Sequence, residues 1–193
     1  MILFALGGGI IGSGGLSVLV AASDRLQLQK EAVLLDCGKR SFANQSNQTI
    51  ASFPSALQII ESSQAIKAII ISHAHVDHFG ALPDASTFAP HAPIYVPEGS
   101  KQLISLQLRK KVFCSSWYED DDSIDEAMDK AIEQIISKIQ EIPFYQRTSI
   151  PNSSFSFQLF PAGHIMGSAM IYLKKMKNNF FFPEIFLINP YFQ

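Results

Sequence analysis

The six residues His73-Ala74-His75-Val76-Asp77-His78 form the most informative segment of this 193-residue chain. Three imidazoles and one carboxylate lie close together there, and these side chains are typical ligands of transition metals. His73 and His75 are two positions apart at the end of a predicted strand, so they can point to the same side. Asp77 and His78 follow where the chain turns toward a helix, and they can face a second metal. The spacing therefore predicts a metal site.

Apolar runs on both sides of this segment predict an α/β fold. Residues 68–72 form a short apolar run that leads directly into His73, which is typical of a strand buried on both faces. Further strands are predicted at residues 2–6, 16–22, 32–35, 94–96, 154–160 and 169–173, and helices at 50–62, 100–111 and 124–139. Because strands and helices are mixed along the chain, the class is α/β.

The composition is that of a globular protein, with 47% hydrophobic and 17% charged residues. A net charge of -2 gives the chain no general basic field of the kind that nucleic-acid binders often carry. Two cysteines, Cys37 and Cys114, make no disulfide framework, so we expect a reducing, cytoplasmic setting. No apolar stretch reaches the roughly 18 residues of a membrane helix, so we expect no membrane association.

The segment HAHVDHFGALP resembles the H-x-H-x-D-H signature of the metallo-β-lactamase superfamily. Two other segments extend the resemblance, which runs from about Gly7 to Leu173. Residues 34–38 (LLDCG) look like the first motif of the family, and residues 162–169 (AGHIMGSA) look like its third motif. The form AGHxxGSA is similar to the β-CASP branch, which includes mRNA 3′-end processing endonucleases and ribonuclease J.

The resemblance implies the following site. One zinc ion would be held by His73, His75 and His164, and a second by Asp77 and His78. Asp36 would support the metal-site loops. Asp77 would also act in catalysis by orienting the water that attacks phosphorus, a water made acidic between two zinc ions. The nitrogen and oxygen donors favour Zn²⁺ and are also compatible with Mn²⁺.

The end of the chain departs from the family pattern. The fourth motif of the family is a Gly-Asp whose Asp bridges the metals, but this sequence has no Asp after Asp129. Glu184 is the only acid after His164 and is a candidate bridging ligand, although Pro183 before it restricts the backbone. A later histidine of the second metal site and the β-CASP domain are also missing from the sequence.

These departures predict a partial domain. We expect the N-terminal portion of a metallo-β-lactamase αβ/βα sandwich over residues 1–176 and a divergent or truncated tail at 177–193. Half of the two-sheet sandwich would be missing, and one or two zinc ions would bind. Such a fragment exposes a sheet edge and apolar surface, which favours a homo-oligomer.

A competing motif, Gly7-x-Gly9-x-x-Gly12 followed by Asp36, has the outline of a dinucleotide-binding fingerprint. It is disfavoured because Gly14 and Gly15 would weaken the helix that must begin there, each by about 1 kcal/mol. It also leaves the histidine cluster without a role.

The predicted function is a zinc-dependent metallo-hydrolase, a β-CASP-type phosphodiesterase or nuclease that acts on RNA, and the missing ligands leave open whether this truncated chain is active. Two alternatives remain. One is a hydrolase of the same superfamily that attacks a thioester or a lactam. The other is a non-catalytic remnant or scaffold, which the missing fourth motif favours.

Overall fold

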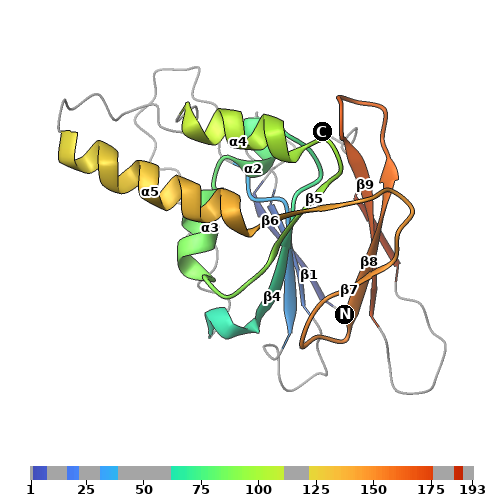
Figure 1. Cartoon of the computed structure of the whole chain (residues 1–193). Coiled ribbons are helices and arrows are strands. Elements are labelled where there is room, and N and C mark those ends of the chain that lie inside the picture. Colours follow the sequence, from blue (N-terminus) through green and yellow to red (C-terminus); the bar gives the residue numbers. More distant parts are fainter. Residues whose placement is uncertain are drawn as a thin grey trace, which may run out of the picture.

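A computed structural model of the chain describes residues 2–7, 17–21, 31–38, 62–110, 122–175 and 185–188. For residues 2–7, 122–125 and 185–188 it describes the backbone. Two sheets lie face to face, and the helices cover the outer face of the larger sheet (Figure 1). The α/β class predicted from the sequence is confirmed.

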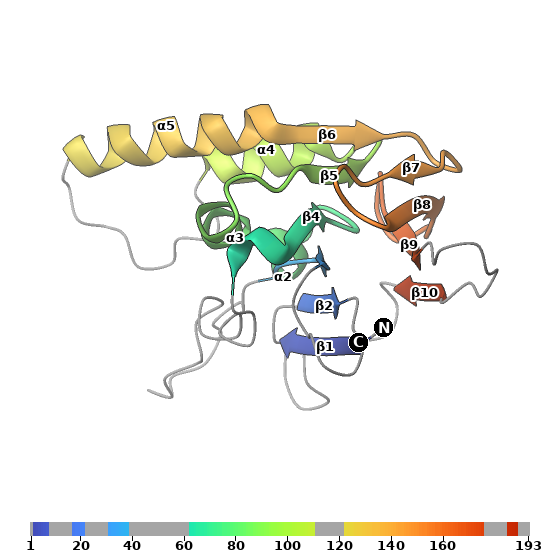
Figure 2. The same cartoon turned by 90° about the horizontal axis from the view of Figure 1, so that it is seen from below.

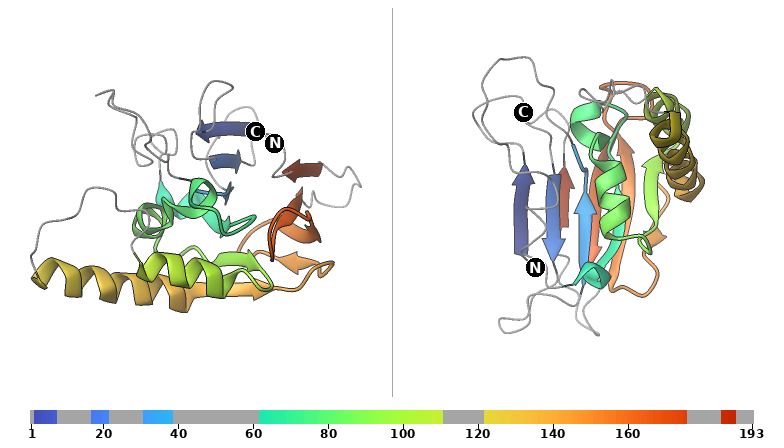
Figure 3. Two further views of the ribbon diagram at one scale, coloured as in Figure 1. Left: turned by 90° about the horizontal axis from the view of Figure 1, so that it is seen from above. Right: turned by 90° about the vertical axis from the view of Figure 1, so that its left-hand side faces the viewer.

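The larger sheet has six strands in the order of the sequence: β1 (Ile2–Gly7), β2 (Ser17–Ala21), β3 (Ala32–Leu35), β4 (Ile66–Ile70), β5 (Ile94–Pro97) and β6 (Ile139–Ile142). The first three strands are antiparallel neighbours, and β3 to β6 run parallel (Figure 3). The carboxyl ends of β3 and β4 therefore meet at one edge, which is where the segment Ser72–His78 begins.

The smaller sheet has four antiparallel strands in the order β10 (Ile185–Ile188), β9 (Ala169–Lys175), β8 (Phe155–Pro161) and β7 (Thr148–Ser149). Both sheets of the sandwich are thus present, and the expectation that half of it is missing was wrong in this respect. No described helix covers the outer face of the smaller sheet (Figure 2). Strand β10 lies in the predicted tail, and the division at residue 176 stays a prediction.

The helices are η2 (Ser63–Ala65), α2 (Val76–Phe79), α3 (Leu82–Phe88), α4 (Lys101–Arg109) and α5 (Asp122–Lys138). Successive residues of a strand point to opposite faces, and this alternation divides the apolar side chains into two cores. Leu34 and Ile69 pack on the helix side, whereas Leu35 and Ile70 pack against the smaller sheet. Among the described residues, no helix is long and apolar enough to cross a membrane.

One helix prediction was wrong at its end. The apolar spacing extends the helix to Ile139, but α5 ends at Lys138, and Ile139 begins β6 beside β5 (Figure 2). Ile139 fits the helical spacing, but it is buried as the parallel partner of Ile94. The predicted helix at 50–62 and most of the glycine-rich turn lie outside the described residues.

The loop between β8 and β9 rests against the larger sheet. The backbone N–H of Ala169 donates to the carbonyl of Ser72 (2.9 Å), and the buried hydroxyl of Ser100 donates to the carbonyl of Gly167 (2.9 Å). Gly167 has a φ of +73°, and a Cβ atom there would collide with the Ser100 side chain and lie 3.0 Å from its backbone nitrogen. This position therefore requires glycine for both its conformation and its space.

Replacing Gly167 with alanine should lower the free energy of unfolding by more than the roughly 1–2 kcal/mol that a left-handed conformation costs a non-glycine residue, because the new methyl group also meets Ser100. Urea unfolding would measure the loss. The matched control is Gly99→Ala, because Gly99 has a φ of +84° but no heavy atom within 4 Å of the place that a Cβ atom would take. Equal losses in the two variants would show that the contact with Ser100 has no energetic weight.

Candidate metal centre

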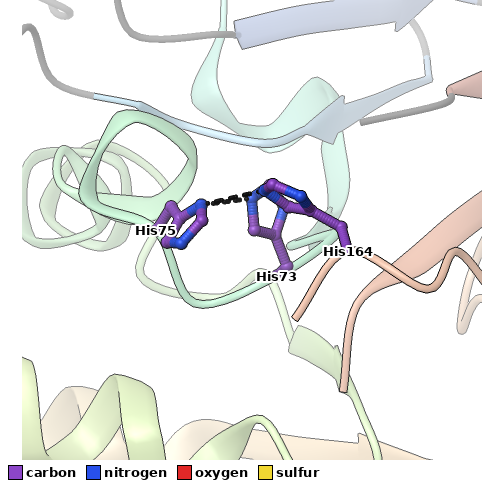
Figure 4. Close-up of side chains that lie close together, drawn as sticks. All are labelled: His73, His75 and His164. Atoms are coloured by element: carbon purple, nitrogen blue, oxygen red, sulfur yellow. Dashed lines mark hydrogen bonds between the residues drawn. The ribbon is translucent and has the colours of Figure 1, made fainter. Parts of the chain in front are cut away.

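Three histidines from both sheets converge on one point (Figure 4). His73 and His75 follow β4 of the larger sheet, and His164 lies in the loop after β8 of the smaller sheet. His75 Nδ1 is 3.0 Å from His73 Nε2 and 3.2 Å from His164 Nε2. All three nitrogens lie within 4.8 Å of one another. The predicted meeting of His164 with the histidines that follow β4 is therefore present in the structure.

Two of the three separations between these nitrogens suit a tetrahedral metal ion. Zinc–nitrogen bonds of about 2.0–2.1 Å at tetrahedral angles place the ligand nitrogens about 3.3 Å apart. The two short separations, 3.0 and 3.2 Å, are close to that value. His73 is buried, His75 is half-buried and His164 is exposed, so one side of the cluster faces solvent. A site of this kind has room for a water molecule or a substrate group as a further ligand.

Asp36 holds the backbone from which these histidines project. Asp36 directly follows β3 and has a backbone φ of 56°. Its carboxylate is fully buried. Oδ1 accepts from the backbone N–H of Ser72 (2.6 Å), and Oδ2 accepts from the Ser72 hydroxyl (2.8 Å). Oδ2 also lies 2.8 Å from His78 Nδ1. The predicted supporting residue thus joins the end of β3 to the end of β4 through two short hydrogen bonds and to α2 through a third short polar contact.

The hydrogen bonds of Ser72 determine which nitrogen of His73 carries the proton. The Ser72 hydroxyl donates its hydrogen to Asp36, so its oxygen is left to accept from His73 Nδ1, 3.0 Å away. A proton on Nδ1 leaves the lone pair of Nε2 directed at the histidine cluster. A second hydrogen bond that fixes the tautomer in this way is usual for metal-binding histidines.

The environment favours the neutral form of two of the clustered imidazoles, those of His73 and His75. Burial, together with the neighbouring imidazoles of His78, His75 and His164, lowers the pKa of His73 to about 3. Burial and the neighbouring His164 also lower the pKa of His75, and the opposing effect of Asp77 is smaller. A neutral imidazole is the form that binds metal, so both side chains are ready to do so at neutral pH.

Asp77 and His78 lie beside the cluster as a pair. Asp77 Oδ2 is 3.7 Å from His78 Nε2, and the rings of His73 and His78 are 4.0 Å apart at their centroids. Burial lowers the pKa of His78, but the hydrogen bond and charge of Asp36 and the charge of Asp77 together raise it above its ordinary value. Within the described part of the chain, Asp77 and His78 join no group of three candidate ligands. Glu184 lies outside the described residues.

Three residues of the site were missed in the sequence. Ser72 orients His73, Ser100 holds the loop of His164, and Gln107 donates from Nε2 to the carbonyl of Ala74 (2.7 Å). The position of Ser72 directly before His73 was a usable signal. The sequence gives no such signal for Ser100 and Gln107, because each contacts a loop far from it along the chain.

The chain is similar in sequence to an RNase J-like protein and to an Integrator complex subunit. It is 28% identical over 161 residues to the RNase J-like protein of Methanocaldococcus jannaschii, a match that covers 83% of this chain and 32% of that protein. It is 25% identical over 146 residues to Integrator complex subunit 11 of Danio rerio, which covers 74% of this chain and 23% of that protein. The chain thus spans about a third or less of the length of these relatives.

The fold has a solved counterpart in a subclass B3 metallo-β-lactamase isolated from a soil metagenome library. The TM-score is 0.54 at 13% sequence identity, and the match covers 91% of this chain and 56% of that one. At this low identity the likeness concerns the fold alone.

The family resemblance seen in the motifs is confirmed by these comparisons, and the names of the relatives agree with the β-CASP branch. The profile of the metallo-beta-lactamase superfamily domain matches residues 25–184, which include Asp36, the segment His73–His78 and His164. With this match and the sandwich fold, the chain belongs to the metallo-β-lactamase superfamily.

Proposed function

We propose that this chain carries the zinc site of a phosphodiesterase that hydrolyses RNA. The single observation that supports this most strongly is the convergence of His73, His75 and His164 from two sheets onto one point. The choice of RNA is supported by the AGHxxGSA segment and by relatives whose names identify them as an RNase J-like protein and an Integrator subunit.

The first zinc ion would be held by Nε2 of His73, Nδ1 of His75 and Nε2 of His164. When bound, it would supply positive charge that lowers the pKa of a water molecule and stabilises charge on a phosphoryl group. The protein orients the first of these nitrogens, Nε2 of His73, before the metal arrives, through the contacts of Asp36 and Ser72. Such preorganisation is what a metal site needs in order to act quickly and selectively.

Asp77 is the proposed catalytic carboxylate. Its side chain is 38% exposed, and its Oδ2 lies 3.7 Å from His78 Nε2. From that place it would accept a hydrogen bond from the attacking water, and so orient it and take up its proton. Asp77 and His78 are also the proposed ligands of a second zinc ion, with Glu184 as a candidate bridging ligand, so we expect one or two zinc ions per chain.

The zinc content of the purified chain tests the site. The wild-type chain should bind one or two zinc ions, and His75→Ala should bind none or much less, because the remaining two histidines leave the first site short of a ligand. Elemental analysis after dialysis against buffered zinc gives the stoichiometry. His91→Ala is the matched control, because His91 lies away from the cluster and donates from Nε2 to the carbonyl of Ile66 (3.1 Å). Equal zinc content in His75→Ala and the wild type would refute the proposed site.

The substrate class is tested separately. The zinc-loaded chain should cleave single-stranded RNA, and Asp77→Asn should reduce the rate by about 10²–10⁴-fold, the usual contribution of a positioned general base. Labelled RNA resolved on a denaturing gel gives the rates, and a thioester and a lactam are assayed in parallel. Asp84→Asn, an exposed change in α3, should leave the rate unaltered. Hydrolysis of the thioester or lactam without cleavage of RNA would contradict the proposed substrate. Bound zinc with no hydrolysis of any substrate would favour a non-catalytic role.

A further inference from the structure

The backbone between the first two histidines has a side-chain support from a distant helix. Nε2 of Gln107, near the end of α4, donates to the carbonyl of Ala74 over 2.7 Å. Ala74 stands between His73 and His75, and it is 2% exposed in the core on the helix side of the sheet. Leaving a buried carbonyl without a hydrogen-bond donor costs free energy, so this bond constrains the position of the Ala74 peptide.

The other hydrogen bonds of this segment lie on either side of Ala74. The N–H of Ser72 is held by Asp36, and its carbonyl accepts from Ala169. The carbonyl of His75 accepts from His78 N–H at the start of α2 (2.8 Å). Among the described residues, Gln107 is the donor that holds the carbonyl of Ala74, between the anchored residues Ser72 and His75.

Helix α4 also contacts the other ligand loop. Ser100, which directly precedes α4, donates to Gly167 in the loop that carries His164. Ser100 and Gln107 are seven positions apart, which is about 10 Å along a helix. Ile104 and Leu108 are fully buried and fix α4 against the sheet. One anchored helix therefore touches both loops whose histidines meet.

We propose that Gln107 is a positioning residue for metal binding, and that α4 braces the two ligand loops at the separation that the ion requires. This proposal rests on the proposed zinc site. Gln107 would not touch the metal or the substrate. It would act through the Ala74 peptide, by keeping Nδ1 of His75 within 3.0–3.2 Å of its two partner nitrogens. Partners of this kind contribute about 10–100-fold to metal affinity in other metalloproteins.

Two substitutions remove the donor. Gln107→Met keeps the length of the side chain, and Gln107→Glu keeps its shape, but neither can donate to Ala74 at neutral pH. Each should weaken zinc binding about tenfold or more, measured by competition with a chelator of known affinity. Gln107→Lys restores a donor and should bind zinc more tightly than either. Gln102→Met is the matched control, because Gln102 is an exposed glutamine on the same helix.

The outcomes separate this proposal from the zinc site itself. Zinc binding by either donor-free variant within twofold of the wild type would overturn the role of Gln107 and leave the zinc site standing. A wild-type chain that binds no zinc would instead refute the proposed function.

A metal-free measurement tests, independently of zinc binding, whether Gln107 positions His75. Nitrogen-detected NMR spectra of the histidine rings in the apo protein should show that Gln107→Glu shifts or broadens the signals of His75 but not those of His91, which lies on a separate loop. Unchanged His75 signals in a folded Gln107→Glu variant would overturn the proposal. Thermal unfolding of each variant establishes that it is folded.

Discussion

The buried carboxylate of Asp36 is the constraint on which the arrangement of the site depends. A charge that is removed from water must be compensated by hydrogen bonds or an opposite charge, and Asp36 meets this need through Ser72 and His78. The compensation ties the end of β3 to the end of β4 and to α2. It also determines the hydrogen bonding of Ser72, and through Ser72 the orientation of the His73 ring. His73 is thus placed by a residue that lies outside the histidine cluster.

The three histidines of the cluster follow strands β4 and β8, which lie far apart in the sequence. The closeness of His73 and His75 could be predicted directly from the sequence. Two residues in one short segment after a buried strand lie near each other in any fold. His164 could be added only through its resemblance to a family motif, since nothing local to residues 162–169 says which strand end they will meet. The structure supplies that information through the pairing of β8 with β9 and the contact of Ala169 with Ser72.

Much of the fold followed from apolar patterning, and the failures have physical causes. Strands β3, β4 and β8 were predictable because their buried residues form short runs or alternate. Strand β6 was missed because Ile139 fits both a helical stripe and a strand, and only its partner Ile94 decides between them. Ser100 and Gln107 were missed because hydrogen bonds between distant segments leave no periodic trace in a sequence.

The division of the three histidines between two sheets has a thermodynamic consequence for the proposed metal binding. His73 and His75 belong to one layer of the sandwich and His164 to the other. An ion held by all three would therefore link the two layers. Any ligand that binds only the folded state stabilises it, in proportion to the logarithm of its free concentration once the site is saturated. Zinc supply would then regulate how firmly the two layers adhere, and loosening of the layers would in turn release the ion.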